Sequence, residues 1–158
     1  MDGLSHLDDE GRARMVDVGG KEVTDREAVA GCRVLLDEHT ARLLAEGGLP
    51  KGDALPVARI AGVQAAKRTP ELIPLCHHVA LTSVEVEIGV DTERGVAEII
   101  ATARAADRTG VEMEALTAAS VAALTLYDLC KAVQSDVVIT DLRLLRKRGG
   151  RSGDLDLE

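Results

Sequence analysis

Two ionisable side chains near the end of a long apolar segment could exchange a proton. The segment covers residues 109–134, reads TGVEMEALTAASVAALTLYDLCKAVQ and is rich in alanine. Asp128 and Lys131 are three residues apart, so they can touch if the segment is helical. Such a pair is usually a solvated ion pair that contributes little to the stability of the fold. In a cleft it could transfer protons, because burial moves both pKa values towards neutrality while mutual attraction opposes that shift.

A second segment, residues 65–78, has Lys67 and Arg68 before two prolines and a cysteine and two histidines after them, and the prolines prevent a continuous helix. Cys76, His77 and His78 are of types that bind zinc, but adjacent residues rarely point at one tetrahedral ion. The sequence has no CxxC, HxH or HExxH pattern to supply further ligands, so we expect no bound metal. A histidine that exchanges a proton or donates to a phosphate is the preferred hypothesis, and a merely packed histidine is the alternative.

Basic side chains are spread along the chain, and a phosphate site would need several of them to converge. Lys51 is the best single candidate, because it lies in a Pro-Lys-Gly-Asp loop, and loops on rigid scaffolds often carry ligand contacts. No GxxxxGK[ST] or GxGxxG pattern occurs, so the phosphate cradles of P-loop and Rossmann folds are absent. The basic segment Gly-Gly-Arg-Ser-Gly at residues 149–153 is not enough by itself to predict a phosphate site. Together these features suggest an enzyme that acts on an anionic compound.

The composition fits one soluble globular domain, residues 1–158, and argues against nucleic acid as a partner. The chain has 158 residues, of which 46% are hydrophobic. Tyr127 is the only aromatic residue, so the core must be aliphatic and no aromatic surface can stack on bases. The net charge of -8 repels polyanions. A small phosphorylated ligand is still compatible, since a few local cations suffice to bind it.

No feature of the sequence indicates export or a membrane. Three separated cysteines, Cys32, Cys76 and Cys130, fit reduced thiols better than disulfides. The first residues carry charges and no apolar run, unlike a signal peptide. The longest apolar stretch, residues 115–127, would be only about 20 Å long as a helix, too short to span a bilayer. We therefore expect a cytoplasmic protein without membrane contact.

The apolar periodicity predicts the elements that position these residues. Alternation predicts strands at residues 12–18, 82–90, 95–104 and 137–145, with the middle two in a hairpin. Helical spacing predicts helices over residues 24–46, 54–67 and 111–134. Thr24 and Glu27 would form a capping box at the first helix, and Gly47 and Gly48 would end it. The termini, about residues 1–10 and 149–158, should be mobile.

The order of these elements predicts an α+β fold, a ferredoxin-like two-layer sandwich with helices packed on one face of an antiparallel sheet. In it, Glu114 and Asp128 would lie about 21 Å apart along one helix. One compact site in one chain cannot use both, so either the substrate is long or a second subunit contributes. Small residues such as Ala118 and Ala122 would let a neighbouring subunit approach, although alanines also pack in ordinary cores.

Five segments carry a family resemblance: MVDV, KGD, ARIAGVQAAKRTPELIPLCH, TGVEMEALTAASVAALTLYD and CKAVQ. They closely resemble the cyclic pyranopterin monophosphate synthase family, the molybdenum cofactor biosynthesis accessory protein C, from about residue 6 to residue 153. The resemblance implies a lyase of molybdopterin biosynthesis. Such an enzyme would convert (8S)-3',8-cyclo-7,8-dihydroguanosine 5'-triphosphate, a cyclised dihydro-GTP made by a radical SAM cyclase, to cyclic pyranopterin monophosphate and diphosphate.

The same resemblance implies roles for particular residues. Two positions depart from the family pattern: His78 stands where proline is expected, which could alter the loop, and Arg151 stands where lysine is common, which preserves the charge. The implied catalytic residues are Asp128, Lys131 and Lys51, and the implied substrate-binding residues are Leu75, Cys76, His77, Met113, Glu114, Glu112, Arg26 and Lys147.

The resemblance further implies a homohexamer, a trimer of dimers with sites between subunits, and no resident cofactor. Glu114 of one chain could then face Lys131 of another, despite their separation within each chain. A Mg²⁺ ion with the triphosphate is left open. Two alternatives from other classes also stay open: an oligomeric protein that carries a nucleotide intermediate unchanged, and a zinc-dependent nucleotide hydrolase that uses Cys76 and His77.

Overall fold

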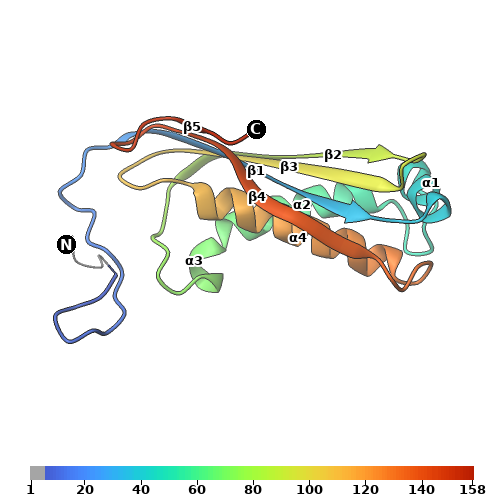
Figure 1. The fold of residues 1–158 in the computed structure, drawn as a ribbon, viewed down its shortest axis with the longest axis horizontal. Coiled ribbons are helices and arrows are strands. Elements are labelled where there is room, and N and C mark those ends of the chain that lie inside the picture. Colours follow the sequence, from blue (N-terminus) through green and yellow to red (C-terminus); the bar gives the residue numbers. More distant parts are fainter. Residues whose placement is uncertain (1–5) are drawn as a thin grey trace.

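The structure, a computed structural model, describes residues 6–158 as a five-stranded antiparallel sheet with helices on one face (Figure 1). Along the sheet the strands are ordered β2-β3-β1-β4-β5. The first four follow the order of a ferredoxin-like fold, so the predicted fold class is confirmed. The elements are β1 (Thr24–Leu35), α1 (Glu38–Glu46), α2 (Ala54–Lys67), α3 (Thr69–Leu72), β2 (Leu81–Asp91), β3 (Val96–Asp107), α4 (Glu112–Cys130), β4 (Val138–Arg148) and β5 (Leu155–Asp156).

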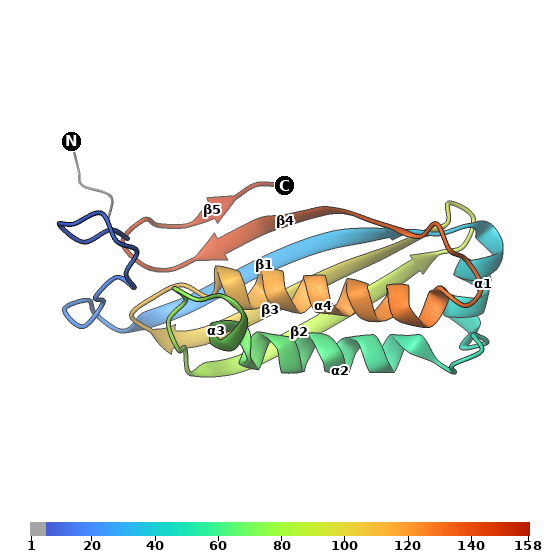
Figure 2. The same ribbon diagram turned by 90° about the horizontal axis from the view of Figure 1, so that it is seen from below.

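Helices α2 and α4 lie side by side across the sheet (Figure 2). Small residues bring them close together, because a Cβ at Gly62 would lie only 2.9 Å from the Ala118 carbonyl oxygen. Ala118 and the other alanines of α4 are fully buried within their own chain. They therefore pack as an ordinary core and are not available to a neighbouring subunit.

Residues 24–35 form the central strand β1, so the helix predicted over residues 24–46 is wrong in its first half. β1 is hydrogen-bonded to β3 on one side and to β4 on the other. Five consecutive residues, from Ala28 to Cys32, are buried. A strand buried on both faces lacks period-two alternation, so its apolar run cannot be distinguished from a buried helix by periodicity.

The caps of α1 differ in part from those predicted. Thr24 and Glu27 lie in β1, and the N-cap is Asp37, whose Oδ1 accepts a hydrogen bond from the Thr40 backbone N–H at 2.6 Å. Gly47 ends the helix in the left-handed conformation, with φ of 69°, as predicted.

The strand predicted at residues 12–18 is also wrong. This segment is irregular apart from a single bridge between Leu7 and Ala13, and most of it is exposed, so no packing surface matches its alternation. An additional strand, β5, returns along β4, where the Leu157 backbone N–H donates to the Leu145 carbonyl at 2.8 Å. Mobility of the termini stays a prediction, and residues 1–5 lie outside the described part of the chain.

The other predicted elements are confirmed with small shifts at their ends. The hairpin of β2 and β3 turns through Gly95, which has φ of 64°, and α2 ends at Lys67 before the prolines. Helix α4 has 19 residues and is long and apolar enough to cross a membrane by length and composition. However, 56% of its apolar window is buried inside the protein. A core helix of a two-layer sandwich has these same properties.

Candidate active site

Lys51, Asp128 and Lys131 form a group of charges at the end of α4, which we call the lysine–aspartate cluster. The Lys51 Nζ lies 3.1 Å from Asp128 Oδ2, and the Lys131 Nζ lies 2.6 Å from Asp128 Oδ1. Lys51 also donates to the Asp128 carbonyl at 3.2 Å. The three residues predicted to be catalytic therefore lie together.

The ends of two helices position this cluster. Asp53 caps α2 by accepting a hydrogen bond from the Leu55 backbone N–H at 3.2 Å, and Gly52 turns the chain with φ of 97°, a conformation that side chains disfavour. Lys131 is the C-cap of α4, and its backbone N–H donates to the Tyr127 carbonyl at 2.9 Å. The backbone beneath both lysines is thus held, while their side chains reach outward to Asp128.

Mutual attraction governs the charges of the cluster. Hydrogen bonds from Lys131 and Lys51 lower the pKa of Asp128, and the contact with Asp128 raises the pKa of Lys131. All three side chains are about half exposed, so burial contributes little. In the single chain, mutual attraction therefore affects the pKa values of Asp128 and Lys131 more than burial does. The sequence alone did not decide between these two effects. Both groups stay charged, and proton exchange between them would need a cover that excludes water.

The remaining predicted site residues gather around the start of α4. The first turn of the helix contributes three of them, and the segment between α3 and β2 contributes three more. They border a cavity of about 260 Å³, which we call the carboxylate pocket. Its predicted site residues are Leu75, Cys76, His77, Glu112, Met113 and Glu114.

Glu114 is the buried carboxylate of this pocket. Its Oε1 lies 3.8 Å from the Cys76 Sγ, and its buried Oε2 has no hydrogen-bond partner among residues 6–158. Burial raises the pKa of Glu114, and burial together with the Glu114 charge raises the pKa of the Cys76 thiol to about 11. A carboxyl group that keeps its proton to higher pH, with one oxygen unpartnered, is suited to exchange a proton with a ligand.

Cys76 and His77 contact different partners. The His77 Nε2 is hydrogen-bonded to the Val16 carbonyl, whereas the Cys76 Sγ faces Glu114. In the described part of the chain, no three His, Cys, Asp or Glu side chains are grouped as metal ligands would be. The geometry at Cys76 and His77 therefore lends the zinc hypothesis no support.

A larger cavity of about 520 Å³ adjoins the carboxylate pocket and shares Thr109, Gly110 and Glu112 with it. Six basic and three acidic residues line this cavity, although the chain as a whole is acidic. We call it the basic pocket. Its basic residues are Lys21, Arg26, Arg108, Lys147, Arg148 and Arg151.

Arg26 and Lys147, both predicted to bind substrate, come from neighbouring strands. The Lys147 Nζ lies 3.2 Å from Glu112 Oε1, and the Arg26 Nε donates to the Asp107 carbonyl at 3.3 Å. Lys147 pairs across β1 and β4 with Ala28, which belongs to the core between the sheet and the helices, so the Lys147 side chain is on the sheet face that carries the helices. The register of β4 therefore brings Lys147 to the first turn of α4.

Lys21 and Arg108 were not predicted to take part in a site. Arg108 Nε donates to the Lys21 carbonyl at 3.1 Å across 87 positions of sequence, a distance over which no local spacing rule applies. The sequence did contain one weak signal for this pocket, the glycine-rich basic segment at residues 149–153. Its residues 149–152 all line the basic pocket.

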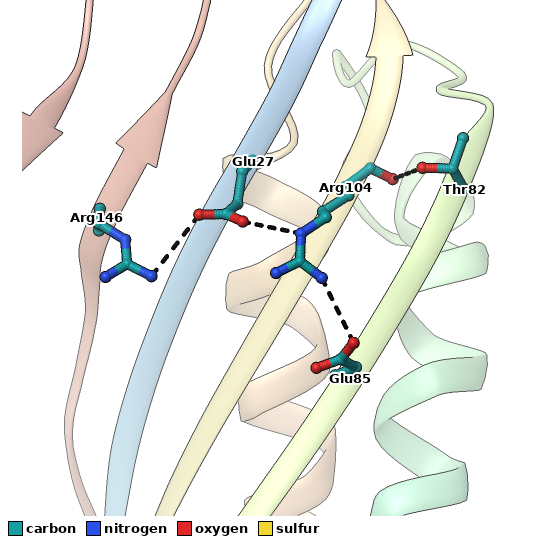
Figure 3. Close-up of polar contacts among 5 residues, drawn as sticks. All are labelled: Glu27, Thr82, Glu85, Arg104 and Arg146. Carbon is teal, nitrogen blue, oxygen red and sulfur yellow. Dashed lines mark hydrogen bonds and ion pairs between the residues drawn. The ribbon is translucent and has the colours of Figure 1, made fainter.

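The part of β1 that carries Arg26 is anchored on the opposite sheet face (Figure 3). Glu27 Oε2 accepts a hydrogen bond from Arg104 Nε at 2.8 Å, and Glu27 Oε1 lies 3.7 Å from Arg146 Nη2. Arg104 also reaches Glu85 on β2 at 3.4 Å. These contacts connect four strands and hold β1 in register beside the basic pocket.

The two groups of predicted site residues lie at opposite ends of α4 (Figure 2). The lysine–aspartate cluster is at its end, and the carboxylate and basic pockets are at its start. Fourteen residues of helix separate Glu114 from Asp128 by about 21 Å. The fold therefore assembles each group but does not join the two within one chain.

An exposed apolar surface on α2 and α4 runs between the two groups. On α4, Leu124 is 58% exposed and lies on the same side as Met113 and Leu116. On α2, Val57 and Ile60 are 47% and 60% exposed. We call these five residues the helix face. Four of them are exposed and Leu116 is partly buried, and exposed apolar side chains of this size are typical of an interaction surface.

Comparison with known proteins gives a consistent result over nearly the whole chain. Residues 15–150 match the MoaC family. The chain is 58% identical over 158 residues to the cyclic pyranopterin monophosphate synthase of Chloroflexus aggregans, covering 100% of this chain and 96% of that protein. It is also 58% identical over 151 residues to the protein of the same name from Parvibaculum lavamentivorans, covering 96% and 94% of the two chains.

A longer relative contains the same region. Over 151 residues the chain is 56% identical to molybdenum cofactor biosynthesis protein 1 of Mus musculus. The match covers 96% of this chain and 24% of the mouse protein.

Proposed function

The chain belongs to the MoaC family, and from this premise we propose that it catalyses the formation of cyclic pyranopterin monophosphate in molybdenum cofactor biosynthesis. The observation that carries the proposal is 58% identity over the full length to a protein named for that activity. The proposed substrate is the cyclised dihydro-GTP supplied by a radical SAM cyclase, and the second product is diphosphate. We expect the reaction to take place in the cytoplasm.

Closure of the cyclic phosphate sets one chemical demand on the site. A hydroxyl oxygen gives up its proton to a base and attacks the α-phosphorus, the bond from that phosphorus to the bridging oxygen breaks, and diphosphate leaves with the electron pair. Cations next to the leaving group stabilise its developing charge. The basic pocket supports this role, since Arg26 and Lys147 line it and its volume of about 520 Å³ can hold a phosphate chain.

Ring rearrangement sets the second demand, a proton acceptor and a proton donor. Asp128 and Lys131 are the proposed pair, and Glu114 is a third group that can exchange a proton. When a neighbouring subunit covers the lysine–aspartate cluster, burial raises the pKa of the aspartate and lowers that of the lysine, which brings the two values closer together. Because Tyr127 is the only aromatic residue, hydrogen bonds and aliphatic contacts must recognise the purine-derived ring.

A second copy of the chain is the proposed cover. If two copies pack through the helix face with their α4 helices antiparallel, the lysine–aspartate cluster of one lies beside the carboxylate pocket of the other. The exposed Leu124 and Ile60 and the unpartnered oxygen of Glu114 support this arrangement. One such two-fold contact completes two sites. Three of these dimers would form the hexamer implied by the resemblance.

The proposal is tested by incubating the purified protein with the cyclised dihydro-GTP and measuring pyranopterin and diphosphate together. Both products should appear in equal amounts. Asp128→Asn and Lys131→Ala should each abolish turnover while the oligomer persists. Arg94→Ala, which removes an exposed cation from the turn between β2 and β3, away from both groups of site residues, is the control and should retain activity.

Two outcomes would replace the proposal with another function. A protein that returns the compound unchanged is a carrier. A protein whose activity follows its zinc content is a metal-dependent hydrolase. Near-normal turnover by Asp128→Asn or Lys131→Ala would remove that residue from the mechanism.

A further inference from the structure

The turn between β4 and β5 passes directly over the guanidinium group of Arg26. Gly150 lies in this turn with φ of 83°, and a Cβ built on it would overlap Arg26 Nη1 and lie 2.9 Å from Arg26 Cζ. Any side chain at position 150 would therefore displace the guanidinium group. The displaced atoms are the far end of a flexible side chain, so the backbone can stay in place.

The guanidinium group of Arg26 has few other constraints. Its Nε donates to the Asp107 carbonyl at 3.3 Å. Within residues 6–158 its two terminal nitrogens make no hydrogen bond or ion pair with the protein, and Arg26 lines the basic pocket together with Gly150. The position of these two nitrogens in the pocket therefore depends on the space above them, which exists because residue 150 lacks a side chain.

The turn itself is held in place by several contacts. The Gly149 backbone N–H donates to Asp154 Oδ1 at 3.1 Å, and the Gly153 backbone N–H donates to the Gly150 carbonyl at 3.2 Å. Beyond the turn, β5 pairs with β4. These contacts close the turn on itself, so a side chain at position 150 would push the flexible guanidinium group aside before it opens the turn.

We propose that Gly150 is a positioning residue for Arg26. It leaves room for the guanidinium group to lie under the turn and to present its terminal nitrogens to the phosphate chain of the substrate and to the departing diphosphate. This inference rests on the proposed function, from which it takes diphosphate as the ligand of the basic pocket. Gly150 contacts no reacting atom and acts through Arg26.

A matched pair of variants in the same turn separates this role from backbone strain. Gly150→Ala and Gly153→Ala both place a side chain at positive φ, 83° and 70°. A Cβ at Gly153 would meet nothing within 4 Å, so it alone leaves Arg26 undisturbed. Calorimetric titration with inorganic diphosphate should show affinity reduced roughly 10- to 100-fold in Gly150→Ala, as for loss of one charge-assisted hydrogen bond. Gly153→Ala should stay within about twofold of wild type.

A double-mutant cycle shows whether Gly150 acts through Arg26. Arg26→Ala should itself weaken diphosphate binding, and adding Gly150→Ala to it should cause no further loss. Independent losses in the double variant would overturn the inference, as would equal effects of Gly150→Ala and Gly153→Ala. If Gly150→Ala does not fold, its combination with Arg26→Ala should fold with the same stability as the combination of Gly153→Ala with Arg26→Ala, because the overlapping atoms are gone. A double variant that also fails to fold would count against the proposal.

Failure of the inference and failure of the proposed function give different results. If the chain lacks synthase activity but its diphosphate affinities agree with the double-mutant cycle expected above, the role of Gly150 is supported and the proposed function is contradicted. If the chain is fully active but Gly150→Ala binds diphosphate as tightly as the wild type, only the inference about Gly150 is contradicted. A wild-type chain that does not bind diphosphate would also overturn the inference.

Discussion

Mixing two inactive variants should restore activity if each site takes groups from two chains. Lys131→Ala disables the lysine–aspartate cluster, and Glu114→Gln disables the carboxylate pocket while keeping the size of the side chain. Each variant alone should be inactive, because every site in its oligomer lacks one group. In a mixed dimer, one site lacks both groups, and the other combines an intact Lys131 with an intact Glu114.

The expected recovery follows from the two-fold arrangement. When equal amounts of the two variants assemble at random, half of the dimers are mixed and half of the sites in these dimers are intact. About a quarter of wild-type activity should therefore return. A site within one chain could not give this result, since the two groups are separated by about 21 Å of helix.

The assay is diphosphate release after the two variants have been dissociated, mixed and reassembled. The matched control mixes Lys131→Ala with Lys51→Ala, whose lost groups belong to the same cluster. Every site in that mixture keeps one defect, so no activity should return. Recovery in the control would refute the shared site. So would inactivity of the test mixture once mass measurements have shown that mixed dimers are present.

Three further changes test the electrostatics and the fold. Glu27→Gln removes the charged acceptor of Arg104 and should lower the free energy of unfolding in urea by about 1–2 kcal/mol, and an unchanged value would contradict the contact. The pKa of Asp128, followed by NMR, should lie below its ordinary value of 3.8 and rise towards it in Lys131→Ala; a pKa that does not move would contradict the attraction. Because this pKa is lowered by folding, the ionised carboxylate stabilises the fold above pH 3.8, and that contribution is lost as the pH falls through the folded-state pKa. Cys76, with a thiol pKa raised to about 11 by burial and by the Glu114 charge, should be alkylated slowly near neutral pH and faster in Glu114→Gln; equal rates would exclude the influence of the carboxylate.

Periodicity predicted those elements that have one face in the core and one face in water. The hairpin of β2 and β3 alternates in burial, so its sequence carries a clear period of two. The prediction failed at β1, where the residues from Ala28 to Cys32 are buried without alternation. Residues 12–18 show the opposite failure, because alternation without a packing partner does not make a strand.

The contacts of the site also divide into those that local spacing predicts and those that only the packing of distant segments creates. Asp128 and Lys131 were predicted to touch because three residues of helix determine that contact, and the observed distance of 2.6 Å agrees. The contact of Lys51 with Asp128 bridges 77 positions and follows from the packing of α2 against α4. The participation of Lys51 in a site was predicted from its loop and from the family resemblance, but no spacing rule predicted its contact with Asp128.

Residue types and helix geometry were enough to indicate the chemistry and to show that one chain cannot join the two ends of α4. Spacing within a single element is set by 1.5 Å per residue whatever the rest of the chain does. Convergence and burial depend instead on sheet register and on the return of distant segments. The folded chain therefore determines that Lys147 reaches Glu112, that Glu114 is buried and that the turn at Gly150 lies over Arg26, because each of these contacts joins segments that no local rule relates.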